Sequence, residues 1–191
     1  MLKQTRQAFL LLVAFSVLTG IIYPLVITGI AQVVFPKQAN GSLIYRDGKP
    51  VGSSLIGQSF TDPKYFWSRP SATSPTPYNA ESSGGSNLGP TNSDLVKAVQ
   101  ERIAALRNAD SGNDAQIPID LVTSSASGLD PHISTAAAEY QIARVAKARR
   151  MDDKVVRQLV AKHTEGRTLG LLGEPRVNVV ELNLGLDILR R

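Results

Sequence analysis

The sequence has no cysteine and little histidine. Without thiols the chain cannot carry cysteine catalysis, a cysteine-ligated zinc site or a disulfide framework, and the redox state of its compartment cannot be read from cysteine use. The two histidines, His132 and His163, have no neighbour at metal-ligand spacing. So few imidazoles also leave few candidates for acid–base catalysis. We therefore expect no metal site and no catalytic residue.

Residues 8–35 contain no charged side chain and no histidine. This run exceeds the roughly 20 residues that cross the hydrocarbon core of a bilayer, so we predict a transmembrane helix over 8–35. A cleaved signal peptide is the main alternative, but its apolar region spans only about 7 to 15 residues before a small-residue cleavage site. A buried core helix would need partner elements that so short a chain can hardly supply.

Basic residues before the apolar run set its expected orientation. Lys3 and Arg6 lie in the segment 1–7, where no acidic residue offsets them. Positive charge beside a span favours the cytoplasmic side, so we expect 1–7 in the cytoplasm and 36–191 on the outer side of the cytoplasmic (inner) membrane. Lys37 and Arg46 weaken the asymmetry, although long domains translocate largely regardless of their charge.

The charges beyond the apolar run argue against a nucleic-acid partner. All 16 acidic residues and all but two of the 21 basic residues follow it, so the net excess there is small. The basic residues are interspersed with acidic ones and form no stripe with aromatics, which is the usual footprint of nucleic-acid binding. The lipid bilayer is the partner that composition supports.

Small, polar or kink-forming residues recur at four-residue steps in the apolar run: Ser16, Gly20, Pro24, Thr28 and Gln32. Helices in lipid associate through small residues that let backbones approach and through polar groups that find partners. We therefore predict a docking seam for other membrane helices along this ridge, with a kink at the proline. The alternative is a plain anchor, because spanning helices tolerate such residues without using them.

The rest of the chain predicts one mixed α+β domain over 36–191. Two turn signals, Asn40-Gly41 and Asp47-Gly48, flank short apolar runs and indicate a hairpin of 42–45 with 51–56. Apolar periodicity with capping residues predicts helices, and apolar runs predict further strands. The expected helices are 94–107 (capped by Asn92 or Ser93), 135–149 (capped by Ser134), 153–163 (capped by Asp152) and 181–189; the expected strands are 117–122 and 177–180.

Residues 58–90 are rich in Ser, Thr, Pro, Gly and Asn but also hold many aromatics. Flexible linkers seldom contain so many large rings, so we expect an ordered loop packed on the domain. Trp, Tyr and Arg are the usual anchors of protein interfaces, which makes this loop a candidate partner surface. The candidates are Tyr65, Phe66, Trp67, Arg69 and Tyr78; the alternative is that these side chains fill the domain's own core.

Two weaker patterns concern chemistry. Ser127, Asp130 and His132 lie close in sequence and could form a nucleophile–base arrangement, as in a membrane-anchored hydrolase, although triads are assembled by geometry and Asp-Pro is an everyday turn. The glycine-rich stretch Ser83, Gly84, Gly85, Ser86 could cradle a phosphate through its backbone N–H groups. It lacks the Lys-Ser or Lys-Thr of a P-loop, and glycine pairs beside serines are usually turns. A free-standing module that binds a small ligand stays open as a third class.

Long motifs in one order carry a resemblance that spans nearly the whole chain. They are FPKQANGSLI, GSSLIGQSFTDPKYFWSRPSAT, PYNAESSGGSNLGPTN, VTSSASGLDPHISTAAAEYQIARVAKAR and VNVVELNLGLD, all after the apolar run. Together they resemble the C subunit family of the bacterial Kdp-type potassium-transporting ATPase.

The resemblance implies an accessory, non-hydrolysing subunit of a high-affinity potassium uptake complex. Its implied partners are a channel-like subunit that selects potassium, a P-type ATPase subunit and a very small stabilising subunit. The resemblance also implies a role as a catalytic chaperone that raises the ATP affinity of the ATPase subunit, with Ser83–Ser86 likened to a nucleotide-binding signature. An external domain conflicts with direct ATP contact, so we expect no cofactor on this chain and ATP only through the ATPase subunit.

Overall fold

The computed structural model describes residues 2–189. Met1 of the expected cytoplasmic segment 1–7 and the last two residues of the expected domain 36–191 lie outside the described residues. The chain divides into two compact units, Met1–Leu43 and Ile44–Arg191. Each unit is described by itself.

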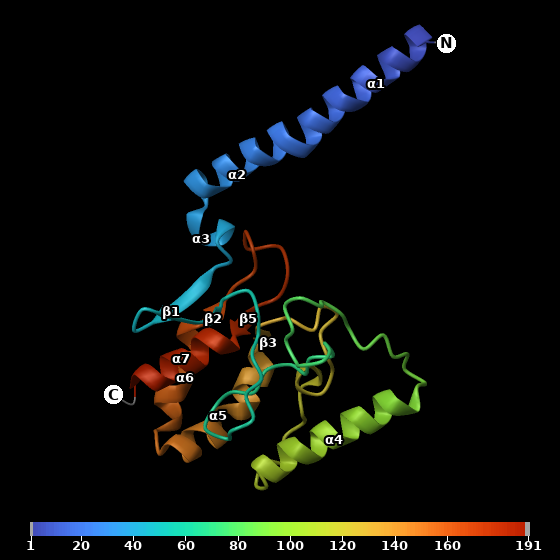
Figure 1. Cartoon of the computed structure of the whole chain (residues 1–191). Helices are drawn as coiled ribbons and strands as arrows, with labels where there is room; N and C mark the ends of the chain where they lie inside the picture. Colours follow the sequence, from blue (N-terminus) through green and yellow to red (C-terminus); the bar gives the residue numbers. More distant parts are fainter. Residues whose placement is uncertain (1, 190–191) are drawn as a thin grey trace. The chain divides into compact units, whose positions relative to one another are not determined.

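The first unit is dominated by one long apolar helix (Figure 1). It comprises α1 (Leu2–Val17), the π turn η1 (Leu18–Ile22) and α2 (Tyr23–Val34), and the short helix α3 (Pro36–Ala39) follows. The 33 residues Leu2–Val34 are long and apolar enough to cross a membrane, and none of their side chains is buried in the described chain. The predicted apolar helix is confirmed, and it begins nearer the N-terminus than the uncharged run.

A wide turn precedes the proline of this helix. Tyr23 donates its backbone N–H to the carbonyl of Leu18, five residues back, which is the π spacing. In a regular α-helix the ring of Pro24 would clash with the carbonyl of Gly20. One wide turn relieves such a clash without breaking the helix, and π turns are common where a helix must adapt locally.

The second unit is a mixed α+β domain, as predicted. Its sheet has the order β3-β5-β4, with β3 (His132–Ser134) and β4 (Thr164–Glu165) both antiparallel to β5 (Arg176–Asn178). Ile133 pairs with Val177 in β5. The helices are α4 (Ser93–Ala109), α5 (Thr135–Arg149), α6 (Asp153–Lys162) and α7 (Val179–Leu189). β1 (Leu43–Arg46) and β2 (Lys49–Ser53) form a separate hairpin at the start of the domain.

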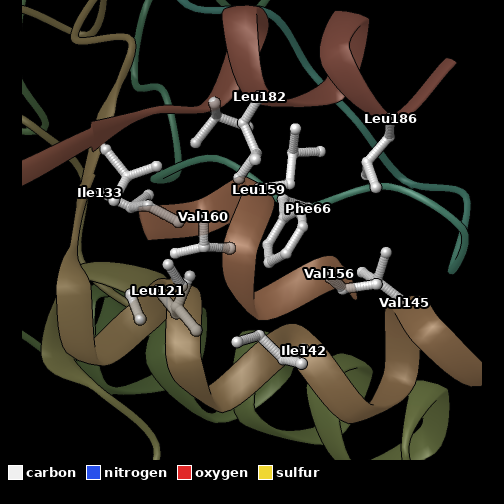
Figure 2. Packing of buried hydrophobic residues seen from close by; sticks show 14 of the residues in the cluster. Phe66, Leu121, Ile133, Ile142, Val145, Val156, Leu159, Val160, Leu182 and Leu186 are labelled. Carbon is white, nitrogen blue, oxygen red and sulfur yellow. The ribbon is translucent and has the colours of Figure 1, made fainter. Parts of the chain in front are cut away.

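One hydrophobic core holds α5, α6, α7 and the small sheet together. Figure 2 shows Ile142 and Val145 of α5, Val156 and Val160 of α6, and Leu182 and Leu186 of α7 converging around the ring of Phe66. Phe66 belongs to none of these elements, because residues 54–92 contain no helix or ladder strand. The predicted ordered loop is therefore confirmed, and it supplies the centre of the core.

All four predicted helices and the hairpin are confirmed; α7 begins two residues before its predicted start. Asn92, Ser134 and Asp152 each accept a backbone N–H at the start of their helix, as expected. In the hairpin, Asp47 and Gly48 both have positive φ, the conformation of a type I′ turn.

The predicted strand 117–122 is wrong, since Ile119–Leu121 form a 3₁₀ turn. Its Asp120 carboxylate accepts from the backbone N–H and the hydroxyl of Ser134, which ties the turn to the start of α5. The predicted strand 177–180 is displaced, because Val179 and Val180 already belong to α7. No sequence pattern predicted β3 or β4.

Candidate functional site

The aromatic segment lies within the domain more than on its surface. Phe66 is fully buried, so its assignment to a partner surface is wrong; it fills the core because the surrounding helices leave it an apolar site. Trp67 packs against the same core and is only partly buried. For this segment the structure therefore favours the alternative that aromatics complete the domain's own core.

Two buried amide side chains hold the segment from the helices. Asn183 of α7 accepts the N–H of Phe66 at 2.9 Å and donates to its carbonyl at 3.0 Å. Gln141 of α5 accepts the N–H of Trp67 at 2.7 Å and donates to its carbonyl at 3.2 Å. Each amide thus satisfies both backbone groups of one residue, as a neighbouring strand would.

Two buried arginines of α5 bind the carbonyls just before these residues. Arg144 donates to the carbonyls of Pro63 and Tyr65, and its guanidinium lies 4.7 Å from the centre of the Trp67 ring. Burial lowers the pKa of Arg144 to about 10, so it stays charged at neutral pH. Arg149 donates to the carbonyl of Lys64 at 2.7 Å.

A carboxylate on α7 completes this network. Asp187 pairs with Arg149 at 2.8 Å and with Arg46 at 3.5 Å, and it accepts the hydroxyl of Tyr65. Burial opposes the charge of Asp187, but the hydrogen bonds from Arg149 and Tyr65 outweigh it and hold the pKa below its usual value. Tyr65 therefore has its polar end engaged within the domain.

Arg69 and Tyr78 link the loop to residues 124–132. Arg69 pairs with Asp130 at 3.3 Å and donates to the carbonyl of Ser124 at 3.4 Å. The Tyr78 hydroxyl donates to the carbonyl of Arg69, and burial raises the pKa of Tyr78. Both residues keep partly exposed side chains, so a partner contact by them stays a prediction.

The arrangement around His132 is that of a turn and an ion pair. The ring Nδ1 lies 3.2 Å from Asp130 Oδ1, and the same carboxylate oxygen accepts the His132 backbone N–H. Ser127 Oγ accepts the N–H of Leu129 instead, and no hydrogen bond among the described residues joins it to His132. The pKa of Asp130 is lowered because the hydrogen bonds from His132, with the Arg69 charge, outweigh the opposing effect of burial.

An open hollow of about 520 Å³ lies beside His132. It is lined by the Arg69–Asp130 pair, by Asp120 and by Arg176, which also pairs with Glu165. Ser127 does not line it. Ser134 also lines it, but its hydroxyl donates to Asp120 at 3.1 Å, and no hydrogen bond among the described residues joins it to His132. The hollow therefore contains polar groups that are already engaged within the domain.

The glycine-rich stretch packs against residues 126–128. Gly84 donates its N–H to the carbonyl of Ser127 at 2.9 Å, and the Ser83 hydroxyl donates to the same oxygen at 3.1 Å. A Cβ on Gly85 would lie 3.0 Å from the Ala126 carbonyl oxygen, so glycine permits this close approach. The Gly84 N–H is thus used internally, and nucleotide contact by Ser83–Ser86 stays a prediction.

The residues of the candidate docking seam are exposed on the apolar helix. Ser16, Gly20, Pro24 and Thr28 are exposed, and nothing lies within 4 Å of a Cβ built on Gly20. Gln32 accepts a hydrogen bond from Asn40 at 3.1 Å, which ties the end of the helix to α3. Within the described residues, no group of three His, Asp or Glu side chains could hold a metal ion.

Comparison with known proteins gives one family. The model of the family described as "K+-transporting ATPase, c chain" matches residues 5–188. Proteins described as the potassium-transporting ATPase KdpC subunit share this similarity. The protein from Polaromonas naphthalenivorans is 65% identical, and the match covers 97% of this chain and 94% of the length of that protein. That of Methylococcus capsulatus is 58% identical over the full length of both.

Proposed function

Because this chain belongs to the K+-transporting ATPase c-chain family and is an accessory subunit of the Kdp potassium uptake complex, we propose that it acts there without hydrolysing ATP. Its apolar helix packs among the membrane subunits, and its α+β domain lies on the outer side of the cytoplasmic membrane. The domain stabilises the channel-like subunit and the assembly. The partners are that subunit, the P-type ATPase subunit and the small stabilising subunit.

One observation carries the proposal. The helix Leu2–Val34 buries none of its side chains against the described chain, and it bears a ridge of small and polar residues. Lipid can cover the Leu and Val faces, but a small-residue ridge gains most from another helix. Lys3 and Arg6 at the start of the helix support a cytoplasmic N-terminus.

Local geometry supports a subunit that is not itself a hydrolase. Ser127 is engaged with Leu129, and His132 is engaged with Asp130, whose second oxygen pairs with Arg69. Nucleophilic catalysis requires a base within hydrogen-bond reach of the nucleophile. We further propose that any increase in the ATP affinity of the ATPase subunit is transmitted through the membrane helices, without ATP contact by Ser83–Ser86.

The location of the domain tests this directly. Ser111 is exposed after α4, and the chain has no other cysteine, so Ser111→Cys creates a single thiol. Intact cells are treated with a membrane-impermeant maleimide. Labelling before lysis is expected from an outer domain. Protection that disappears on lysis would place the domain in the cytoplasm and make direct nucleotide contact by Ser83–Ser86 the better explanation.

A further inference from the structure

The loop between β4 and β5 presents a cluster of leucines to solvent. Leu169, Leu171 and Leu172 are 87%, 80% and 62% exposed, whereas single exposed leucines scattered over a surface are unremarkable. In Figure 1 this is the orange-red loop that extends away from β5. We call residues 166–173 the leucine loop. None of its three leucines belongs to the core described above.

The backbone holds this loop in a defined shape. Thr168 and Leu172 exchange both backbone hydrogen bonds, at 2.8 and 2.9 Å, and Gly170 donates to the carbonyl of Arg167. Leu169 has φ +55°, a left-handed conformation that leucine rarely adopts, and Gly170 follows at +74°. Strained residues of this kind are concentrated where a segment must be held ready for a ligand or partner. The leucine loop is therefore a preformed apolar tip.

The base of the loop is electrically neutral. Arg167 binds both carboxylate oxygens of Glu174 at 2.8 Å, and Arg176 binds Glu165 at 2.8 Å on the paired strands. The leucine loop has no aromatic residue, and its one basic residue is Arg167. Segments at a bilayer surface are enriched in Trp and Tyr, and unpaired Lys or Arg attract them to anionic lipid. Its charge and composition therefore match an uncharged apolar socket in a protein better than an anionic lipid surface.

We propose that the leucine loop inserts into an uncharged apolar socket on the extramembrane surface of another subunit of the potassium-transporting complex. This rests on the proposed function, because it requires the domain to lie against such a subunit. An apolar centre with a polar rim is the usual arrangement of a protein interface. Here the leucines supply the centre and the Arg167–Glu174 pair supplies the rim. A fixed turn also loses little conformational freedom on binding.

Two matched variants test the contact in the complete complex. Leu169→Asn with Leu171→Ser removes the apolar tip, and asparagine tolerates the left-handed backbone at 169 better than leucine does. Leu169→Met with Leu171→Met keeps an apolar tip of similar volume. We expect the polar pair to lower the recovery of membrane subunits with the affinity-tagged full chain by roughly tenfold or more. The methionine pair should retain recovery, and neither should lower the midpoint of thermal unfolding of the chain.

Cross-linking then identifies what covers the tip. Leu171→Cys in this cysteine-free chain is loaded with a thiol-linked benzophenone and irradiated in native membranes. An adduct with a membrane subunit is expected. An adduct with lipid and none with a membrane subunit would overturn the proposal in favour of the bilayer. A dimer of this chain, or no adduct with unchanged recovery, would also overturn it.

The two proposals fail differently in this design. If the unmodified chain recovers no membrane subunits, the proposed function fails. If it recovers them and the polar pair recovers them equally well, only the socket is wrong.

Discussion

Two amide side chains organise the centre of this domain. Asn183 and Phe66 are separated by 117 positions in the sequence, and Gln141 and Trp67 by 74, yet each pair makes two hydrogen bonds. Buried backbone groups without a partner are costly, so a segment that lacks a strand neighbour needs such side chains. The amides therefore let an irregular segment place an aromatic ring in the core.

We expect Asn183→Ala to destabilise the domain by about 3 kcal/mol, because it removes two hydrogen bonds and leaves the N–H and carbonyl of Phe66 unpaired. The measurement is denaturant unfolding of the detergent-solubilised chain, followed by the fluorescence of its one tryptophan, Trp67. The matched control is Asn108→Ala on the exposed face of α4, which should change stability by less than about 0.5 kcal/mol. Equal effects of the two changes would contradict the assigned role of Asn183.

These contacts explain why the sequence could not predict whether the aromatic side chains lie in the core or at a partner surface. Large rings and arginines serve equally at interfaces and in small cores, so residue type left both alternatives open for Tyr65, Phe66 and Trp67. The distinction depends on partners far along the chain. The leucines of the leucine loop also lack a periodic pattern that would predict a helix or a strand. They lie between glycines, which is the one local feature that sets them apart in the sequence.

At the scale of elements, helices were predictable and short strands were not. The three capped helices begin at or beside the predicted residues because capping side chains and apolar periodicity are local signals. β3 and β4 have three and two residues, too few to show an alternating pattern. They exist because β5 pairs with both of them, which only the tertiary fold provides.

The π turn affects the seam along the apolar helix. At about 100° per residue, the side chains of Ser16 and Pro24 would point in directions that differ by roughly 80° around the axis of a regular α-helix. One extra residue in a turn between them reduces this difference to about 20°. The π turn Leu18–Ile22 lies between them. It therefore brings Ser16, Gly20 and Pro24 close to one face.

We expect Gly20→Leu to weaken association with the membrane subunits roughly tenfold, because a large side chain would keep the backbones of two helices apart. Gly29→Leu is the matched control: it lies about 140° around the helix from Pro24. Neither added side chain meets another part of this chain within 4 Å at its Cβ, so both variants should form the helix. The measurement is the recovery of intact complex in mild detergent. Equal recovery with both variants would remove the docking seam.

For the whole molecule, three partly buried groups with lowered pKa values, two carboxylates and one histidine, connect the stability of the domain to acid pH. Asp130 and Asp187 have lowered pKa values, as described above. Burial also lowers the pKa of His163 at the end of α6, although Glu181 opposes this. The imidazole ring of His163 packs closely against α7, because a Cβ built on Gly185 would lie 2.9 Å from His163 Nε2. In all three cases the unfolded chain binds a proton at a higher pH than the folded domain does.

Because the unfolded state binds these protons more readily than the folded state, acid destabilises the domain, and it does so in two stages. As pH falls below about 6.5, the usual pKa of histidine, the unfolded state gains protonated His163 first; below about 4 the unfolded state gains protonated Asp130 and Asp187. We expect the free energy of unfolding to be steady near pH 8, to decline between about pH 6.5 and 5, and to decline again below about pH 4. The measurement is denaturant unfolding of the full chain at each pH.

His163→Asn separates the two stages. Asparagine does not titrate, and φ −96° at position 163 is a backbone conformation open to any residue. The variant should therefore lose the decline between about pH 6.5 and 5 while keeping the one below about pH 4. His132→Asn controls for the loss of a histidine elsewhere in the domain and should leave the first stage in place. A first decline that persists in His163→Asn would show that another group carries it, and the burial of His163 would then not govern the pH response of the domain.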